Sequence, residues 1–188
     1  MNKKKLNIYL NAPITLGFVI ICTIVLVLDY ITKGITTHLF FSTYHSSFLN
    51  PLTYVRLIGH VFGHANITHL ISNMTYILLL GPMLEEKYKN KLIYVIIISA
   101  LATGLINNIF SPNTILLGAS GVCFSFILLS SITGTKEGVP VTLIIVAILW
   151  IGGEIYSGIA VADNISQISH IIGGLIGAFM GMKFKSND

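Results

Sequence analysis

The sequence predicts an all-α membrane protein whose helices form one six-span bundle. Of the 188 residues, 54% are hydrophobic and only 10% are charged, whereas a soluble domain carries about 25% charged residues. The mean hydropathy is +0.83. A chain of this length can supply six helices of about 20 residues each, the length that crosses a hydrocarbon core. Little of the chain then remains for a soluble domain.

Six apolar runs are each expected to form a membrane-spanning helix. They cover residues 14–30, 67–84, 92–110, 118–132, 141–156 and 165–182. The first run follows three lysines, but no small-residue cleavage pattern comes after it, so we expect a retained helix rather than a signal peptide. The runs form one domain over residues 14–183, flanked by short cytoplasmic tails over residues 1–13 and 184–188.

The basic residues predict the orientation of the chain, because cytoplasmic segments of membrane proteins are enriched in Lys and Arg. With the N-terminus in the cytoplasm, the inner segments hold Lys3, Lys4, Lys5, Lys87, Lys89, Lys91, Lys136, Lys183 and Lys185. The outer segments hold only Lys33 and Arg56. We therefore expect an integral multi-pass protein with both termini in the cytoplasm. The net charge of +4 lies at helix ends and indicates no nucleic-acid partner.

Two segments differ from ordinary loops and spans. Residues 31–66, the first outer connection, are rich in aromatic side chains such as Phe40, Tyr44 and Phe48. A connection this long is rarely unstructured in a compact domain, and we expect it to lie partly helical in the outer membrane interface. The fourth run is short for a full span and is expected to begin inside the bilayer.

Four polar side chains from three of the predicted helices meet at one depth. The second, fourth and sixth runs all enter the membrane from the outside. His69 and Asn73 share one face at the start of the second run, Ser120 begins the fourth, and His170 lies in the second turn of the sixth. At about 1.5 Å per residue, all four lie within about 10 Å of the outer surface. Polar groups in hydrocarbon are costly unless they are paired or functional.

Ser120 and His170 have the chemistry of a nucleophile and its base. A serine attacks a carbonyl after a base takes its proton, and histidine suits this task at neutral pH. The Asn73 amide, a His69 N–H and the Ser120 backbone N–H are candidates to stabilise the oxyanion. No acidic residue is placed to orient His170, since Asp163 lies seven residues earlier in the chain. We therefore expect a catalytic dyad.

Glycines indicate close packing of the fourth and sixth helices. Gly173 and Gly177 lie four residues apart on the sixth run, in a small-xxx-small pattern that lets a neighbouring helix approach. Gly118 and Gly121 flank the serine. Phe124, one turn beyond Ser120, is placed to pack against the imidazole of His170.

An ordered set of motifs resembles the rhomboid family of intramembrane serine proteases. It consists of Gly118-Ala119-Ser120-Gly121, His170-x-x-Gly173-x-x-x-Gly177, His60-x3-His64-Ala65-Asn66-x2-His69-x3-Asn73 and the segment Leu80-Gly81-Pro82-Met83-Leu84-Glu85-Glu86-Lys87. The likeness covers about residues 54–181. The chain departs from frequent family residues at Thr53, Val55, Phe124 and Ser169.

This resemblance implies a function and a role for each site residue. Ser120 would be the nucleophile and His170 the general base and acid, with Asn73 and His69 assisting the oxyanion. Arg56 would structure the first outer connection, and Glu85 would tie down the inner end of the second helix. The family would cut transmembrane segments of substrate proteins near their outer end, at small residues. We expect this chain to lie in a bacterial-type cell membrane. Water would enter through an outward-facing cavity, with no cofactor.

The same residues allow other functions. A catalytically inactive relative that binds transmembrane helices as a chaperone would be expected to lack the serine or the histidine, whereas this chain has both. A small transporter or channel would use Glu154 and the histidines. Such a protein predicts charged residues deeper in the bundle and often an internal repeat, and this sequence shows neither. His60 and His64 are spaced like metal ligands, but no third ligand is evident. We therefore expect no metal, and we expect these histidines to anchor the loop through hydrogen bonds.

Overall fold

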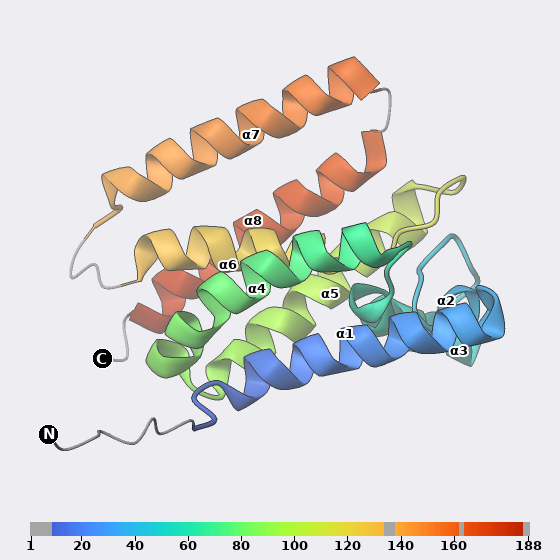
Figure 1. Cartoon of the computed structure of the whole chain (residues 1–188). Helices are drawn as coiled ribbons and strands as arrows, with labels where there is room; N and C mark the ends of the chain where they lie inside the picture. The colour runs from blue at the N-terminus through green and yellow to red at the C-terminus, as the bar shows by residue number, and fades with distance from the viewer. Residues whose placement is uncertain (1–8, 134–137, 162–163, 186–188) are drawn as a thin grey trace, which may run out of the picture.

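The computed structural model describes residues 9–133, 138–161 and 164–185. Regular structure in these ranges is helical, without strands, which confirms the all-α prediction there. The helices in chain order are α1 (Pro13–Thr32), α2 (Ile35–Phe40), α3 (Pro51–Gly59), the 3-10 turn η1 (His60–Phe62), α4 (Ile67–Tyr88), α5 (Lys91–Phe110), α6 (Ser120–Ile132), α7 (Val141–Val161) and α8 (Asn164–Lys185). Figure 1 shows the long helices running roughly side by side.

Three helices of the described ranges are long and apolar enough to cross a membrane. They are α1, α4 and α5, whose most apolar windows have mean hydropathies of 2.5, 1.3 and 2.0. Two shorter apolar helical stretches are Ser120–Ile132 and His170–Phe184. The number of six spans therefore stays a prediction. Residues 1–8 and 186–188 of the expected cytoplasmic tails, and Lys136 in the expected inner turn, lie outside the described residues.

The bundle exposes apolar side chains and buries polar ones. Ile31 on α1 and Leu79 on α4 are each 71% exposed, although both are large and apolar. Ser99 and Ser125, which lie on α5 and α6, are fully buried. Such a surface suits hydrocarbon, because lipid solvates apolar groups and leaves polar groups to find partners inside the protein.

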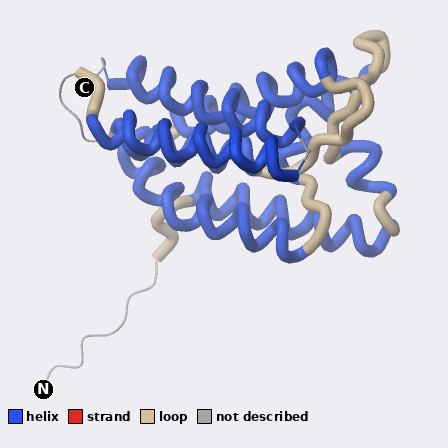
Figure 2. The backbone as a smooth tube through the Cα atoms, turned by 90° about the horizontal axis from the view of Figure 1, so that it is seen from above, coloured by secondary structure: helices blue, strands red, loops and turns tan. Residues whose placement is uncertain are grey.

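Helices α6 and α8 form the centre of the packing. Helix α8 contacts α5, α6 and α7, with its most extensive contact against α6. Helix α7 packs on α6 and α8 at one side of the bundle, whereas α1 packs on α4 at the other side (Figures 1 and 2). The main core cluster lies between α1, α4, α5 and α6 and includes Cys22, Leu84, Leu92 and Phe126. Neither Cys22 nor Cys123 forms a disulfide.

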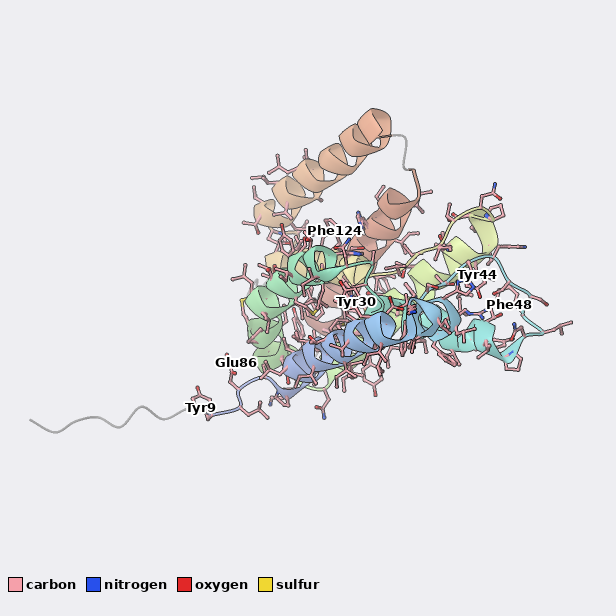
Figure 3. The ribbon with its side chains drawn as sticks, turned by 45° about the vertical axis from the view of Figure 1, so that its right-hand side comes forward. Tyr9, Tyr30, Tyr44, Phe48, Glu86 and Phe124 are labelled. Carbon is pink, nitrogen blue, oxygen red and sulfur yellow. The ribbon has the colours of Figure 1, made fainter. Side chains whose placement is uncertain are left out.

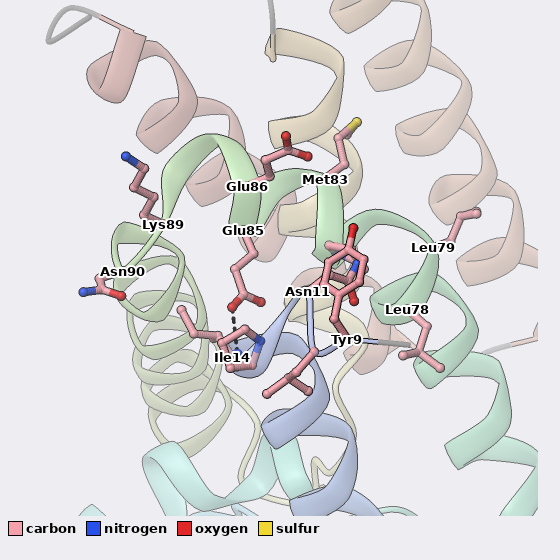
Figure 4. Close-up of a pocket in the computed structure, with 13 residues that line it drawn as sticks. Tyr9, Asn11, Ile14, Leu78, Leu79, Met83, Glu85, Glu86, Lys89 and Asn90 are labelled. Carbon is pink, nitrogen blue, oxygen red and sulfur yellow. Dashed lines mark hydrogen bonds between the residues drawn. The ribbon is translucent and has the colours of Figure 1, made fainter. Parts of the chain in front are cut away.

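Glu85 on α4 caps the first turn of α1. The helix begins at Pro13, and Ala12 before it has no side chain that could accept from the free N–H groups of the first turn. The Glu85 carboxylate accepts from the backbone N–H groups of Ile14 and Thr15 and from the Thr15 hydroxyl, each at 2.8 Å. Figure 4 shows this contact between the two helices. Because the carboxylate also complements the helix dipole, it joins α1 to α4 at this end.

The segment 31–66, predicted to be the first outer connection, is tied to the C-terminal end of α5 and to the loop before α6. Asn108 accepts from the Ser46 N–H at 2.8 Å and donates to the Ser46 carbonyl at 3.2 Å. His45 Nδ1 lies 2.8 Å from the Asn108 carbonyl oxygen. Thr43 and Leu116 exchange two backbone hydrogen bonds of 2.8 Å. The connection therefore packs against the segment that leads to Ser120.

Arg56 on α3 is buried within this connection. Its side chain is 4% exposed, its Nε donates to the Leu39 carbonyl at 3.0 Å, and its guanidinium carbon lies 4.5 Å from the centre of the Tyr44 ring. Figure 3 shows Tyr44 and Phe48 at the end of the molecule opposite Tyr9. Arg56 thus links α3 to the chain around α2.

His60 joins the first outer connection to α5. It lies outside the helices that are long and apolar enough to cross a membrane, and it is 1% exposed. Its Nδ1 lies 3.2 Å from the Arg56 carbonyl, and its Nε2 lies 3.2 Å from the Thr103 hydroxyl. A neutral ring that donates from Nδ1–H to the Arg56 carbonyl leaves Nε2 beside the Thr103 hydroxyl, which also lies 2.8 Å from the Ser99 carbonyl. Burial lowers the pKa of His60 to about 4, which keeps the ring neutral at pH 7.

Replacing Glu85 by Gln is expected to lower the free energy of unfolding by about 1–3 kcal/mol, because the charged acceptor of three hydrogen bonds is lost. Denaturation of the purified protein in mild detergent measures this change. Glu86→Gln is the matched control, since Glu86 is exposed and points away from Ile14 (Figure 4). Equal destabilisation by the two substitutions would contradict the capping role.

The protein is expected to lose stability as the pH falls from about 6.5 to about 4. Folded His60 stays neutral down to about pH 4, whereas a histidine in the unfolded chain binds a proton near pH 6.5. The unfolded state then binds more protons, so the free energy of unfolding falls with decreasing pH, by up to about 1.4 kcal/mol per unit for this group.

Denaturation series at several pH values measure that slope. The substitution His60→Gln should flatten the fall, because it removes a buried group that titrates differently in the two states. The exposed His38→Gln should keep the wild-type slope. A slope that His60→Gln leaves unchanged would show that this histidine does not carry the pH dependence.

Candidate active site

A cavity of about 380 Å³ lies between α4, α6 and α8. It is lined by His69, Ser72, Asn73, Tyr76, Leu116, Leu117, Ser120, Cys123, Phe124, Ile127 and His170. The four polar residues that the sequence places at one depth therefore line one cavity. They come from three helices that are separated by many residues along the chain.

Ser120 is the first residue of α6, and the turn before it has a conformation that requires glycine. Gly118 has φ +118°, a region that L side chains rarely adopt. Its N–H donates to the His60 carbonyl at 2.9 Å. The expected run 118–132 is therefore helical only from Ser120 onward, because the positive φ of Gly118 is incompatible with a right-handed helix. The N–H of Ser120 is then one of the unpaired donors of a helix start.

His170 lies on α8 with its ring against Phe124 of α6. The two ring centres are 4.5 Å apart, and the planes are inclined by 41°. This is a favourable separation for an aromatic pair. The ring of His170 is half-buried and borders the same cavity as Ser120. Figure 3 shows Phe124 in the region where α6 and α8 pack.

Glycines on α8 allow this close approach of the two helices. A Cβ at Gly173 would overlap the backbone carbonyl of Gly121, and a Cβ at Gly177 would overlap the backbone carbonyl of Ser125. The two backbones are therefore in direct contact. Any larger residue at either position would push α8, and His170 with it, away from α6.

Asn73 and His69 lie over the turn that carries the serine. A Cβ at Gly118 would come within 2.7 Å of the His69 ring and 3.4 Å of the Asn73 amide nitrogen. Asn73 is 6% exposed, and its Nδ2 donates to His64 Nε2 at 3.1 Å. The thiol of Cys123 donates to the Asn73 backbone carbonyl at 3.4 Å. These contacts hold the amide beside Gly118 and Ser120.

His64 supports Asn73 from the loop before α4. Its Nδ1 lies 3.2 Å from the Phe62 carbonyl, which fits a tautomer that donates from Nδ1 and accepts from Asn73 at Nε2. Its ring meets that of His69 edge-on at 5.1 Å. Burial, with a smaller effect from His69, lowers the pKa of His64 to about 4. The expectation that this histidine makes anchoring hydrogen bonds agrees with these contacts.

Two of the supporting residues lie away from the cavity. Arg56 is within the first outer connection, and Glu85 is at the opposite end of α4, so neither lines the cavity. The side chain of Glu154 and the whole of Asp163 lie outside the described residues. His60 and His64 both use their rings in the hydrogen bonds above, and no group of three metal-binding side chains occurs among the described residues.

Six residues that line the cavity were not predicted from the sequence: Ser72, Tyr76, Leu116, Leu117, Cys123 and Ile127. On α4 the lining residues are His69, Ser72, Asn73 and Tyr76, and on α6 they are Ser120, Cys123, Phe124 and Ile127. Both sets follow the spacing i, i+3, i+4 and i+7 that defines one helix face. Extending the face from Asn73 to Tyr76, and from Ser120 to Ile127, would have found them. Leu116 and Leu117 carry no such signal, because they lie in a loop.

The chain is similar to known proteins. The family model described as a Rhomboid domain matches residues 51–187. Rhomboid-related protein 1 of Caenorhabditis elegans is 29% identical over 137 residues, which are 67% of this chain and 38% of that protein. Rhomboid protease GlpG of Yersinia pestis (strain Pestoides F) is 27% identical over 176 residues, which are 89% of this chain and 62% of that protein.

The chain spans less than two thirds of the length of these relatives. The matched segment nevertheless includes α3 to α8 and every residue that lines the cavity, from His69 to His170. It covers well over half of the chain. This protein therefore belongs to the rhomboid family.

Proposed function

We propose that this protein is an intramembrane serine endopeptidase that acts through a Ser120–His170 dyad. The observation that carries the proposal is the shared cavity of Ser120, His170, Asn73 and His69. Membership of the rhomboid family and the similarity to relatives named rhomboid protease GlpG support it. The reaction would be hydrolysis of a peptide bond in a transmembrane segment of another protein.

In the proposed first step, the Ser120 hydroxyl attacks the peptide carbonyl while His170 takes its proton. The same imidazolium then protonates the leaving amine, and an acyl-enzyme remains on Ser120. A water molecule, activated by His170, attacks this ester and releases the second product. Phe124 would fix the plane of the imidazole through the ring contact of 4.5 Å. No cofactor is needed for these steps.

Asn73 is the principal candidate for oxyanion stabilisation. One of its two amide hydrogens is used in the bond to His64, which leaves the other for a ligand in the cavity. The backbone N–H of Ser120 at the start of α6 is a second donor, and the ring of His69 is a third. Donors held by such contacts need little reorganisation when negative charge develops.

The short length of α6 supports a site below the membrane surface. Its 13 residues span about 20 Å at 1.5 Å per residue, which is less than the hydrocarbon thickness of about 30 Å. With the inner end of α6 at the cytoplasmic face, Ser120 would lie inside the outer leaflet. We infer six spans, cytoplasmic termini in a bacterial-type cell membrane, and cleavage near the outer end of the substrate segment at small residues.

A catalytically inactive relative that binds transmembrane helices is the alternative function. It needs the same bundle and the same lipid-facing surface, but it does not need a nucleophile beside a base. The presence of Ser120 and His170 on one cavity favours the protease. Both functions share transmembrane proteins as partners, so only a test of hydrolysis separates them.

Substituting Ser120 by Ala is expected to abolish cleavage, because the attacking oxygen is removed. Wild type and variant, purified in detergent or in liposomes, are incubated with a single-span substrate that bears small residues near its outer end. Ser131→Ala is the matched control, since its hydroxyl donates to the Leu128 carbonyl of the same helix and Ser131 is not among the residues that line the cavity. Cleavage that survives Ser120→Ala, or that is absent in wild type, would refute the protease function.

Substituting Asn73 by Ala is expected to lower kcat by about 10²-fold, the usual loss when one oxyanion donor is removed. The KM should change little, because the donor acts mainly on charge that develops in the transition state. Steady-state kinetics on the same substrate measure both constants, and the melting temperature verifies that the variant is folded. Equal kcat values for Asn73→Ala and wild type would remove Asn73 from the mechanism.

A further inference from the structure

Two serine hydroxyls form a buried link between three helices, one turn below the candidate site. The Oγ atoms of Ser99 on α5 and Ser125 on α6 are 2.6 Å apart. Ser125 Oγ lies 2.5 Å from the carbonyl oxygen of Gly173 on α8 and 3.1 Å from that of Gly121 in its own helix. Both serines are fully buried. This pair has no place in the proposed chemistry.

The number of available hydrogens decides which serine donates in each hydrogen bond of the link. A serine hydroxyl carries one hydrogen, and carbonyl oxygens only accept. The shortest contact of Ser125 is to Gly173, so its hydrogen is donated there, and Ser99 then donates to Ser125 Oγ. The link therefore runs from Ser99 through Ser125 to the backbone of α8. Cooperative polarisation strengthens such a chain where water is excluded.

The acceptor at Gly173 is close to the base along α8. Gly173 follows His170 by three residues, which is about 4.5 Å along the helix axis. Ser125 follows Ser120 on α6 in the same direction. The hydrogen bond from Ser125 to Gly173 thus connects the helix of the nucleophile to the helix of the base within about two turns of both residues.

The packing around this bond explains why it matters. Around this bond the surface of α8 is formed by Gly173 and Gly177, and a Cβ at either position would overlap the α6 backbone. Glycine surfaces let helices approach closely, but they provide no interlocking side chains to oppose sliding or rotation. A hydrogen bond is directional and short. It therefore helps to fix the register of α8 along α6, together with the ring contact between Phe124 and His170.

We propose that Ser125 and, through it, Ser99 are positioning residues that set the register of His170 against Ser120. They touch neither the substrate nor the reacting atoms. This inference rests on the proposed protease function, because it concerns the alignment of the same dyad. Small displacements of a base from its nucleophile cost large factors in rate, so loss of the link should lower kcat.

The two serines should contribute unequally. Ser125→Ala removes the bond to α8 altogether, whereas Ser99→Ala leaves Ser125 free to donate to Gly173. We expect kcat to fall about tenfold in Ser125→Ala and about threefold in Ser99→Ala, with KM within about twofold of wild type. Because Ser99 acts through Ser125, the double variant should be no slower than Ser125→Ala alone.

The experiment measures kcat and KM on a single-span substrate and the rate at which a fluorophosphonate labels Ser120 in detergent. Labelling reports the reactivity of the serine without transmembrane substrate binding. Ser130→Ala is the matched control, because its hydroxyl donates to the Ile127 carbonyl within α6 and not to another helix among the described residues. All rates are taken well below the melting temperature of each variant. Slower turnover and slower labelling at unchanged KM, with normal Ser130→Ala, support the positioning role.

A Ser125→Ala variant with kcat and labelling within about twofold of wild type would overturn the positioning role, as would an equal loss in Ser130→Ala. Where Ser125→Ala does not fold, the same criteria are applied to Ser99→Ala, which keeps the bond to α8. The protease function is tested separately by wild type and Ser120→Ala. An active, Ser120-dependent enzyme that is indifferent to Ser125→Ala refutes only the positioning role, whereas an inactive wild type refutes both.

Discussion

Helix α8 lies against α6 because Gly173 and Gly177 have no side chains. A Cβ at either position would overlap backbone carbonyls of α6, so the two glycines set the separation at which His170 borders the cavity of Ser120. In hydrocarbon, close packing and interhelical hydrogen bonds provide the attraction that the hydrophobic effect supplies in water. The candidate site depends on this one interface, since Ser120 and His170, the proposed nucleophile and base, come from opposite sides of it.

Water is scarce inside a bundle that lies in hydrocarbon, and this explains the other buried polar contacts. Glu85 caps α1 from a neighbouring helix. The backbone carbonyl of His60 accepts a hydrogen bond from the Gly118 N–H, and the Asn73 amide donates to His64. Each contact satisfies a group that has no solvent to bind and also fixes one helix or loop relative to another. Stability and alignment of the site are thus provided by the same hydrogen bonds.

The residues of the candidate site were predictable to different degrees. Ser120, His170, Asn73 and His69 stand out because a polar side chain in an apolar run is costly. The other cavity-lining residues of the same helix faces, up to Tyr76 on α4 and Ile127 on α6, follow helical spacing and could also have been predicted. Leu116 was not predictable, because it reaches the cavity through a backbone pairing with Thr43, and such long-range pairing leaves no local pattern.

The sequence by itself determined the helical class, the apolar runs and the polar positions within them, because burial cost and helical periodicity act on neighbouring residues. It also carried the motifs of the rhomboid family. Only the tertiary structure decided that Glu85 caps α1, that the helix of Ser120 begins after a positive φ at Gly118, and that Ser99 and Ser125 reach Gly173. The hydrogen bonds of Glu85, Ser99 and Ser125 join segments far apart in the chain, and packing alone selects their partners.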